Sequence, residues 1–433
     1  MTMNVNNQFI SGVKWTTIGT LSITICNVLK LSVLARFLSK DDFGVFAIVL
    51  FFLGFFKLFS EMGLTTAILH KQDINKNEYA SLYWFNIMFC IILYFLLYII
   101  TPFISGFYSE PSLDSLVKIL GLSIIINAIG LQFRTIETKN MTFRYISIID
   151  VIGSVSSLFL AVFLAANGYG ILSLIYSLLL QYIIVNLLLL FLGLKNHGIA
   201  FWFRFKDLDK FLRIGLFQLG GQTANFFNRN FDILIIGKFF SQEILGGYSL
   251  AKQLVFRPSQ VINPILTKVA APALSKFQNN LELLKYNYLR LVNIVSSINF
   301  MIYLLLAVFS PFVVEIFYGD SYSSIVILVR VLCLYMVFRA ILNPIGSLVV
   351  ATGRTGLEFV WNIVLLFFMP IVVYLGAIFG IVEVTISLTL WIILLFLPSW
   401  YFLVRKMTGA TLKEYVLAII SFKPSYVAKL LVK

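Results

Sequence analysis

Long apolar runs recur from one end of this chain to the other, and they restrict its fold more than any other feature. We place about twelve of them, at residues 14–38, 43–66, 79–104, 115–135, 145–166, 169–194, 211–240, 245–268, 287–310, 322–347, 356–380 and 382–404. Each run is long enough to cross about 30 Å of hydrocarbon as a helix, and far longer than the roughly 10-residue strands of a membrane barrel. The sequence therefore predicts an all-α polytopic membrane protein.

The composition agrees with a membrane setting. Of the 433 residues, 60% are hydrophobic and only 12% are charged, so a soluble fold would lack polar surface. The opening residues MTMNVNNQFISGVKW lack a basic segment before a short apolar core, so we expect the first span to be retained. Cys26, Cys90 and Cys333 all fall inside predicted spans. We therefore expect no disulfide, no metal and no cofactor.

Charged residues alternate between the two sides of the predicted spans. In a soluble domain the formal net charge of +14 would suggest nucleic acid, but here the cations gather on one set of loops. That set holds Lys71, Lys76, Arg134, Lys139, Arg144, Lys195, Arg204, Lys206, Lys210, Arg213, Lys268, Lys276, Lys285, Arg354 and the tail from Arg405 to Lys433. The other set holds Asp41, Asp42, Glu110, Asp114, Glu243, Glu315, Asp320 and Glu383, with Lys40 its one clear cation. Because cytoplasmic loops are enriched in Lys and Arg, we predict that both termini are cytoplasmic, which requires an even number of spans.

The longest internal segment outside the spans divides the chain. It reads KNHGIAFWFRFKDLDK at 195–210 and alternates basic with aromatic residues, which is typical of a strip in the membrane interface. We predict that this cytoplasmic linker joins an N-terminal six-helix bundle, 1–194, to a C-terminal six-helix bundle, 211–405. Residues 406–433 are predicted to form a basic amphipathic cytoplasmic tail, with a simple solvated tail as the alternative.

The two halves resemble each other at a constant offset. The segment ARFLSKDDFGVF at 35–46 aligns with GKFFSQEILGGY at 237–248, so Gly44 matches Gly246, and Gly19 matches Gly221. The offset spans an even number of predicted helices, so both copies point the same way across the membrane. This predicts a parallel repeat of two six-helix bundles around a central cavity. Chance similarity between two apolar segments is the alternative.

The first helix of each half carries a polar stripe. In the C-terminal half, five residues recur with the spacing of one helical face: Gln218, Gln222, Asn225, Arg229 and Asp232. The corresponding positions of the first helix include Asn27 and Lys30. In lipid such a stripe has to face protein or a water-filled cavity. Ordinary hydrogen bonding between helices is the alternative explanation for the Asn and Gln residues.

Further cations lie inside the predicted spans, most of them near mid-depth. They are Lys30, Lys57, Arg229, Lys252, Arg257, Arg330 and Arg339, whereas the acidic residues at that depth are Asp232 and Glu61. A charge at the bilayer centre costs about 3 kcal/mol on insertion scales, so some of these cations are expected to face a hydrated cavity that receives an anion. Arg330 and Arg339 project from opposite faces of one helix, so at least one of them could serve only to brace its neighbours.

The chain lacks the motifs of a nucleotide-driven pump or a hydrolase. It has no glycine-rich phosphate loop with its Lys, no G-x-S-x-G elbow, and no loop long enough for a soluble catalytic domain. We therefore expect a transporter rather than an enzyme. Two alternatives stay open: a cation-coupled multidrug exporter, and a polytopic polysaccharide polymerase or ligase, which we would expect to carry Arg or His on a sizeable outer loop.

Seven blocks in order along both halves carry a family resemblance. They are LARFLSKDDFGVFAIVLFFLGF, FSEMGLTTAILHK, FRTIETKNMTFRYISIIDVIG, NRNFDILIIGKFF, LGGYSLAKQLVFRPSQVINPI, APALSKFQNN and NPIGSLVVATGRTGLEFVWNIV. Through them the chain resembles the bacterial oligosaccharide and polysaccharide flippases of the multidrug/oligosaccharidyl-lipid/polysaccharide exporter superfamily, from about residue 10 to about residue 380. Glu61–Met62 stands where similar proteins often carry Asp-Leu.

The resemblance implies a V-shaped twelve-helix transporter in the bacterial inner membrane. Its substrate would be an undecaprenyl-pyrophosphate-linked oligosaccharide repeat unit of O-antigen, capsule or exopolysaccharide. Its partners would be membrane lipids and polysaccharide polymerase or assembly proteins. We expect a monomer that binds no nucleic acid. The seven cations named above would attract the pyrophosphate, and Asn27, Gln218, Gln222 and Asn225 would bond sugar hydroxyls. Asp232 and Glu61 would pair with cations or take part in coupling.

Overall fold

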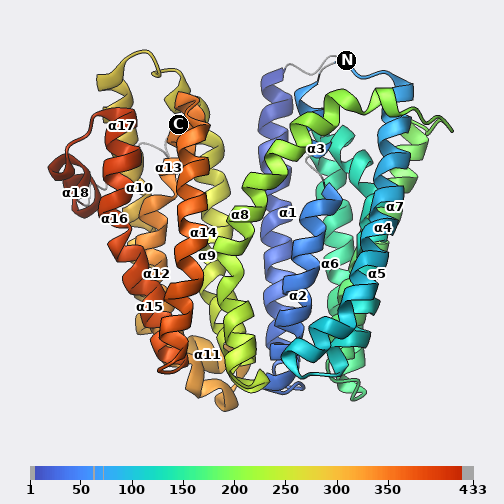
Figure 1. Ribbon diagram of the computed structural model, residues 1–433, viewed down its shortest axis with the longest axis horizontal. Helices are drawn as coiled ribbons and strands as arrows, with labels where there is room; N and C mark the ends of the chain where they lie inside the picture. The colour runs from blue at the N-terminus through green and yellow to red at the C-terminus, as the bar shows by residue number, and fades with distance from the viewer. Residues whose placement is uncertain (1–4, 62–63, 72, 422–433) are drawn as a thin grey trace. The chain divides into compact units, whose positions relative to one another are not determined.

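Helices make up all the regular structure in the parts of the chain that the structure describes. The structure is a computed structural model that describes residues 5–61, 64–71 and 73–421 (Figure 1). The chain forms two compact units, Met1–Gly246 and Gly247–Lys433. Each unit is described by itself below, as the first unit and the second unit.

The first unit is a bundle of long helices. Its elements are α1 (Val5–Leu34), α2 (Lys40–Glu61), α3 (Leu64–His70), α4 (Lys76–Tyr108), α5 (Ser112–Lys139), α6 (Phe143–Ala166), α7 (Leu172–Asn196), the 3₁₀ turn η1 (Phe205–Asp207), α8 (Asp209–Phe239) and the first turn of α9 (Gln242–Ser275). The most extensive packing joins α1 to α6, α5 to α7, α6 to α7 and α4 to α5, while α8 packs against α2 and α3.

The second unit contains shorter and more broken helices. After α9 it has α10 (Leu281–Val308), α11 (Ser310–Tyr318), the 3₁₀ turn η2 (Asp320–Ile325), α12 (Val326–Leu342), α13 (Pro344–Thr352), α14 (Thr355–Ala377), α15 (Ile381–Leu394), α16 (Phe396–Ser399), the π-helical turn η3 (Trp400–Val404), α17 (Arg405–Thr408) and α18 (Leu412–Ile420). Pro344 separates α12 from α13, because proline lacks the N–H that would continue the helix. Here α10 packs against α12, and α14 and α12 pack against α15.

The predicted membrane spans are present. Within the described residues, ten helical segments are long and apolar enough to cross a bilayer: Lys14–Leu34, Lys40–Glu61, Lys76–Tyr108, Ser112–Lys139, Phe143–Ala166, Leu172–Asn196, Leu281–Val308, Asp320–Thr352, Gly356–Ala377 and Ile381–Thr408. The other two predicted spans, 211–240 and 245–268, coincide with α8 and α9, which have 31 and 34 residues. The chain is therefore an all-α polytopic membrane protein.

The division of the chain into 1–194, 195–210, 211–405 and 406–433 stays a prediction. The repeat assigns α8 to the C-terminal half, whereas compactness groups α8 with the first unit, where it packs against α2 and α3. The two criteria measure different properties, since one follows the sequence similarity between the halves and the other follows which helices bury each other's surface.

Two glycines related by the repeat meet where α2 and α9 begin. A Cβ at Gly44 would lie 2.0 Å from the carbonyl oxygen of Gln242, and a Cβ at Gly246 would lie 1.8 Å from the carbonyl oxygen of Lys40. Lys40 and Gln242 correspond to each other at the same offset, so each helix places one glycine against the backbone of the other. Small residues allow such close approach of membrane helices. The contact is a symmetric feature of the kind that an internal repeat would produce.

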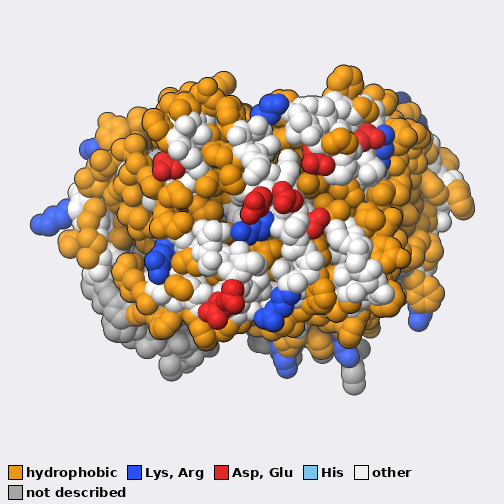
Figure 2. Space-filling model, turned by 90° about the horizontal axis from the view of Figure 1, so that it is seen from below, with side chains coloured by type: hydrophobic (Ala, Val, Ile, Leu, Met, Phe, Trp, Pro, Cys, Tyr) orange, Lys and Arg blue, Asp and Glu red, His pale blue; other side chains and the backbone are white. Residues whose placement is uncertain are grey.

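Charge differs between the two ends of the first unit. Its α3–α4, α5–α6 and α7–α8 connections hold Lys71, Lys76, Lys139, Lys195, Arg204 and Lys206 together with Asp73, Asp207 and Asp209. At the other end, the lower end of these helices in Figure 1, α2 begins with Asp41 and Asp42, and the α4–α5 connection holds Glu110. Seen from below, that face shows acidic and also basic side chains among apolar ones (Figure 2). That Lys40 is the one clear cation of the loops on this side stays a prediction, since Lys118 and Lys238 belong to α5 and α8. Lys118 pairs with Asp114 at 2.8 Å, and Lys238 donates to the Phe107 carbonyl at 2.6 Å, so these cations are held by neighbouring acceptors.

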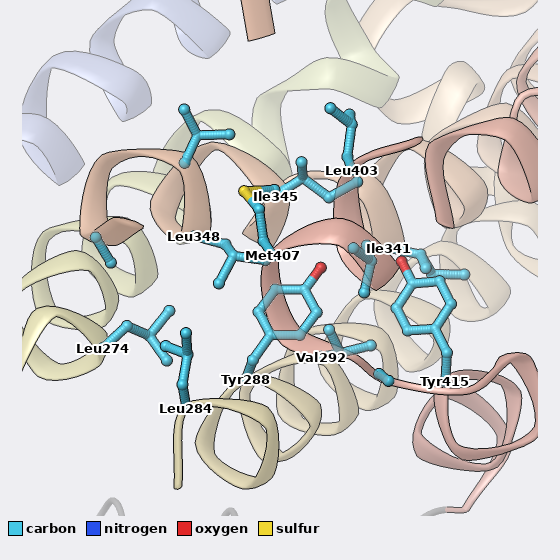
Figure 3. Packing of buried hydrophobic residues seen from close by; sticks show 14 residues of the cluster. Leu274, Leu284, Tyr288, Val292, Ile341, Ile345, Leu348, Leu403, Met407 and Tyr415 are labelled. Carbon is cyan, nitrogen blue, oxygen red and sulfur yellow. The ribbon is translucent and has the colours of Figure 1, made fainter. Parts of the chain in front are cut away.

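The C-terminal segment, as far as Ser421, is a helix docked on α10. Thr411 and Glu414 form a capping box at the start of α18, and the ammonium of Lys285 lies 2.9 Å from the Glu414 carboxylate. At the other end, Asn293 donates to the Ala418 carbonyl at 2.8 Å. Tyr288 of α10 and Tyr415 of α18 are buried among Val292, Ile341 and Met407 (Figure 3). Of the predicted tail, residues 422–433 lie outside the described residues.

We expect acid to loosen α18. Hydrogen bonds from the Thr411 backbone N–H and from Lys285 lower the pKa of Glu414 from 4.5 to about 2. A carboxyl group with a lower pKa in the folded state stabilises that state above pH 4.5, and the contribution is lost as the pH falls from 4.5 towards 2. A spin label at Ile420 should therefore gain mobility across this window. Glu414→Gln should make the label mobile at neutral pH. A label whose mobility stays the same on acidification and in Glu414→Gln would contradict the expectation.

Candidate substrate site

Lys30 is a buried cation between α1 and α6. Its side chain is 8% exposed, and its ammonium donates to the Ser157 hydroxyl across the helix pair at 3.0 Å. Ser147 and Ser157 are buried on the side of α6 that faces α1, whereas the buried Ser154 accepts from Gln181 of α7 at 3.1 Å. Hydroxyls and carbonyls are the acceptors that a lysine needs when it leaves water. The structure therefore places Lys30 deep inside the first bundle with a polar helix face beside it.

Lys57 and Glu61 lie one helical turn apart on α2. The ammonium of Lys57 is 5.6 Å from the centre of the Tyr182 ring on α7, within the range of a cation–π contact. Both Lys57 and Glu61 are half-buried. Lys57 is thus held at an aromatic face, which leaves hydrogen-bond donors of its ammonium available for a ligand or water.

The polar stripe on α8 contains one buried acid among more exposed residues. Asp232 is 3% exposed and accepts a hydrogen bond from the Ile233 N–H at 2.9 Å, while Arg229 is exposed. Asn225 is exposed, and Gln222 and the corresponding Asn27 of α1 are half-buried. The side chain of Gln218 lies outside the described residues. The stripe therefore offers polar groups at several depths within the bundle.

Phenylalanines hold α8 against α2. The rings of Phe51 and Phe226 have centroids 5.3 Å apart, and those of Phe55 and Phe227 are equally close at 5.3 Å. A Cβ on Gly54 would lie 3.0 Å from Phe226, so a larger side chain on α2 would displace the ring. Apolar packing on this face fixes the rotation of α8 about its axis, and that rotation decides where Arg229 and Asp232 project.

In the second unit, two of the predicted cations share an aromatic pair. Phe256 of α9 stacks on Tyr335 of α12 with centroids 6.3 Å apart and planes 21° apart. The guanidinium of Arg339 lies 5.4 Å from the Phe256 ring and 5.6 Å from the Tyr335 ring, and it donates to the Tyr335 hydroxyl. The ammonium of Lys252 lies 5.7 Å from Phe256. Lys252, Phe256, Tyr335 and Arg339 are called the cation–aromatic cluster below.

The other two cations of the second unit make different contacts. Arg257 donates to Gln260 on its own helix at 3.4 Å. Arg330 is exposed and donates to the Ser310 hydroxyl at the start of α11, at 3.2 Å. Arg330 thus joins two helices, whereas Arg339 sits in the cation–aromatic cluster. This difference is what the opposite helix faces of these two arginines imply.

Sequence reasoning missed the aromatic members of these contacts. Phe256 follows Lys252 by one helical turn, and Tyr335 precedes Arg339 by one turn, so both pairs were visible as neighbours on a helix surface. Tyr182 and Ser157 had no such signal, because they reach Lys57 and Lys30 from distant helices. Only the tertiary structure brings these residues together.

Comparison with known proteins identifies the family. A model of the family described as polysaccharide biosynthesis protein matches residues 33–327. The chain belongs to this family. It is similar to the lipopolysaccharide biosynthesis protein WzxC of Escherichia coli K12, with 28% identity over 419 residues that cover 96% of this chain and 85% of WzxC.

Solved structures show which known fold this chain shares. The lipid II flippase MurJ, in an inward closed conformation, matches with a TM-score of 0.78 and 15% identity over 97% of this chain and 93% of MurJ. An inward-facing multidrug resistance MATE transporter matches with a TM-score of 0.71 and 16% identity over 91% of this chain and 100% of that chain. At such identities the likeness concerns the fold. The chain is therefore a multi-pass membrane protein of a polysaccharide biosynthesis family with a transporter fold.

Proposed function

We propose that this protein flips undecaprenyl-pyrophosphate-linked oligosaccharide repeat units across the bacterial cytoplasmic membrane by alternating access. The observation that carries the proposal is the cation–aromatic cluster, in which Lys252 and Arg339 are held on membrane helices against the Phe256–Tyr335 pair. A guanidinium binds phosphate oxygens through paired hydrogen bonds, and aromatic rings stack against the apolar faces of sugars. The names of WzxC and MurJ, one a lipopolysaccharide biosynthesis protein and the other a lipid II flippase, support the same substrate class.

The proposed roles of the other residues follow from their contacts. Lys30, Lys57, Arg229 and Arg257 supply further positive charge to the pyrophosphate, and Arg330 braces α11 against α12. Asn27, Gln218, Gln222 and Asn225 bond sugar hydroxyls. Asp232 and Glu61 balance cations before the substrate arrives. Moving a lipid-linked glycan between leaflets makes and breaks no covalent bond, so the proposed activity needs no catalytic residue and no cofactor.

The sign of the charge favours this substrate over a cationic drug. The fold alone does not distinguish a lipid-linked glycan from a drug as the substrate, since a MATE drug transporter matches nearly as much of the chain as MurJ does. An organic cation would meet Lys252 and Arg339 in the cation–aromatic cluster, and like charges in a poorly hydrated site repel. A pyrophosphate is an anion, so Lys252 and Arg339 would attract it. The distribution of charge therefore supports an anionic substrate.

A reconstituted transport assay tests the proposal directly. We expect purified protein in liposomes to move a fluorescent undecaprenyl-pyrophosphate oligosaccharide between leaflets, which a glycosidase added outside would detect as faster and more complete cleavage. Protein-free liposomes are the control. Transport of ethidium without transport of the lipid-linked glycan would establish the drug-exporter alternative instead. The proposed orientation, with both termini cytoplasmic, predicts that an impermeant thiol reagent labels a cysteine at Ser321 and spares one at Lys206 in intact cells.

A further inference from the structure

A pocket in the first unit lies apart from all the residues assigned above. It has a volume of about 490 Å³ and is formed by the starting turns of α4, the last turns of α5, and the chain that follows α7. Its polar lining comes from Lys76, Tyr79, Gln132, Asn196 and His197, and its apolar lining includes Phe133 and Ile136. The pocket therefore offers polar groups and apolar surface side by side.

Several polar side chains of the pocket are held by hydrogen bonds. Gln132 is 8% exposed, and its amide donates to the Tyr79 carbonyl at 2.8 Å, which holds it at the pocket wall. Behind the wall, the buried carboxylate of Glu137 lies 3.1 Å from the His197 ring and accepts from the Asn196 amide at 3.3 Å. These contacts orient His197 and Asn196 before any ligand binds. Preorganised polar groups of this kind are a feature of binding sites.

The segment after α7 forms the rim of the pocket and carries exposed aromatic surface. Trp84 donates to the Ala200 carbonyl at 3.1 Å and stacks on Phe201 with centroids 5.4 Å apart, so the segment is tied to α4. Phe201 is nevertheless 91% exposed, and Phe205 is 68% exposed. Exposed aromatic rings beside basic residues suit the headgroup region of a membrane. The rim of the pocket is therefore suited to the headgroup region.

We propose that this pocket binds the phosphate-bearing headgroup of an anionic phospholipid. Lys76 provides the charge for the phosphate, Gln132 and Asn196 bond headgroup oxygens, and the Phe133 side of the pocket covers the first methylenes of the acyl chains. A free phosphate ion would use the polar groups but would make no use of the apolar surface beside them. The pocket belongs to the end of the first unit that carries the cytoplasmic loops in the proposed orientation. Lipid bound there would hold the α7–α8 connection on the membrane surface.

Native mass spectrometry of the full chain, released from nanodiscs of equal phosphatidylglycerol and phosphatidylcholine content, tests the proposal. We expect the protein to retain phosphatidylglycerol preferentially, and Lys76→Gln to weaken that retention about ten-fold, as loss of a charge-assisted bond would. Gln132→Ala should weaken it less, by about three-fold, because it removes a neutral bond. Lys206→Gln is the matched control, because it removes one charge from an exposed residue of the α7–α8 connection that does not line the pocket.

Three results would overturn the proposal. Retention that Lys76→Gln leaves unchanged would exclude the pocket as the lipid site. Equal losses for Lys76→Gln and Lys206→Gln would show a diffuse charge effect. Thermal stabilisation by inorganic phosphate that depends on Lys76, with no preference for phosphatidylglycerol, would identify a soluble phosphate site. None of these measurements depends on glycan transport, so the lipid-site proposal can be rejected without rejecting the proposed function, and the reverse also holds.

Discussion

Replacing Gly246 by alanine should remove most of the folded protein from the membrane. The new Cβ would lie 1.8 Å from the Lys40 carbonyl oxygen and 2.8 Å from the Gly44 nitrogen, and both are backbone atoms of a helix that cannot turn aside as a side chain can. Overpacking of a tight interior contact typically costs about 1–3 kcal/mol, and a backbone clash this close falls at or above the upper end of that range. The starting turns of α2 and α9 would have to separate, and the ion pair between Lys40 and Glu243, at 3.5 Å, would separate with them.

Membrane abundance and detergent melting temperature measure this effect. Gly44→Ala should behave in the same way, because its Cβ would lie 2.0 Å from the Gln242 carbonyl oxygen. Gly106→Ala is the matched control, since a Cβ on Gly106 in α4 would meet nothing within 4 Å. Wild-type abundance and melting temperature for Gly246→Ala would show that α2 and α9 are not this close in the membrane.

Replacing Arg339 by alanine should abolish most glycan export while leaving the protein in the membrane. The guanidinium contacts both the Phe256 and Tyr335 rings, so its loss removes the guanidinium that we propose binds the phosphate in the cation–aromatic cluster. A hydrogen bond to a charged group contributes about 1.5–3 kcal/mol, which corresponds to a loss of roughly ten-fold to a hundred-fold in transport. Arg339→Lys should retain part of the activity, because lysine keeps the charge but loses the planar fork.

Complementation of a flippase deletion, normalised to the amount of protein in the membrane, measures this loss. Arg354→Ala serves as the control, because Arg354 is exposed and donates to the Lys406 carbonyl outside the cluster. Full export by Arg339→Ala would remove the cluster from the substrate path. Reduced abundance with normal export per molecule would show that Arg339 acts only on folding.

Much of the fold follows from the sequence, because crossing a bilayer is a local requirement. About twenty consecutive apolar residues form a helix in lipid whatever surrounds them, since every backbone group has to be bonded within the segment. The predicted spans therefore coincide with helices that the structure describes. The offset between the halves likewise pointed to Gly44 and Gly246, although it gave no hint that these glycines lie against each other's helices.

The partners of the candidate site residues depended on tertiary structure. A cation inside a span could be recognised from composition, but which ring or hydroxyl it meets is decided by the rotation and neighbours of its helix. Ser157 reaches Lys30, and Tyr182 reaches Lys57, from helices far along the chain. The docking of α18 has the same origin, because Asn293 of α10 supplies the donor that its last carbonyls require. Local hydrophobicity thus determined which segments are membrane helices, and packing between distant segments decided which polar groups meet, because no local signal records a neighbour from elsewhere in the chain.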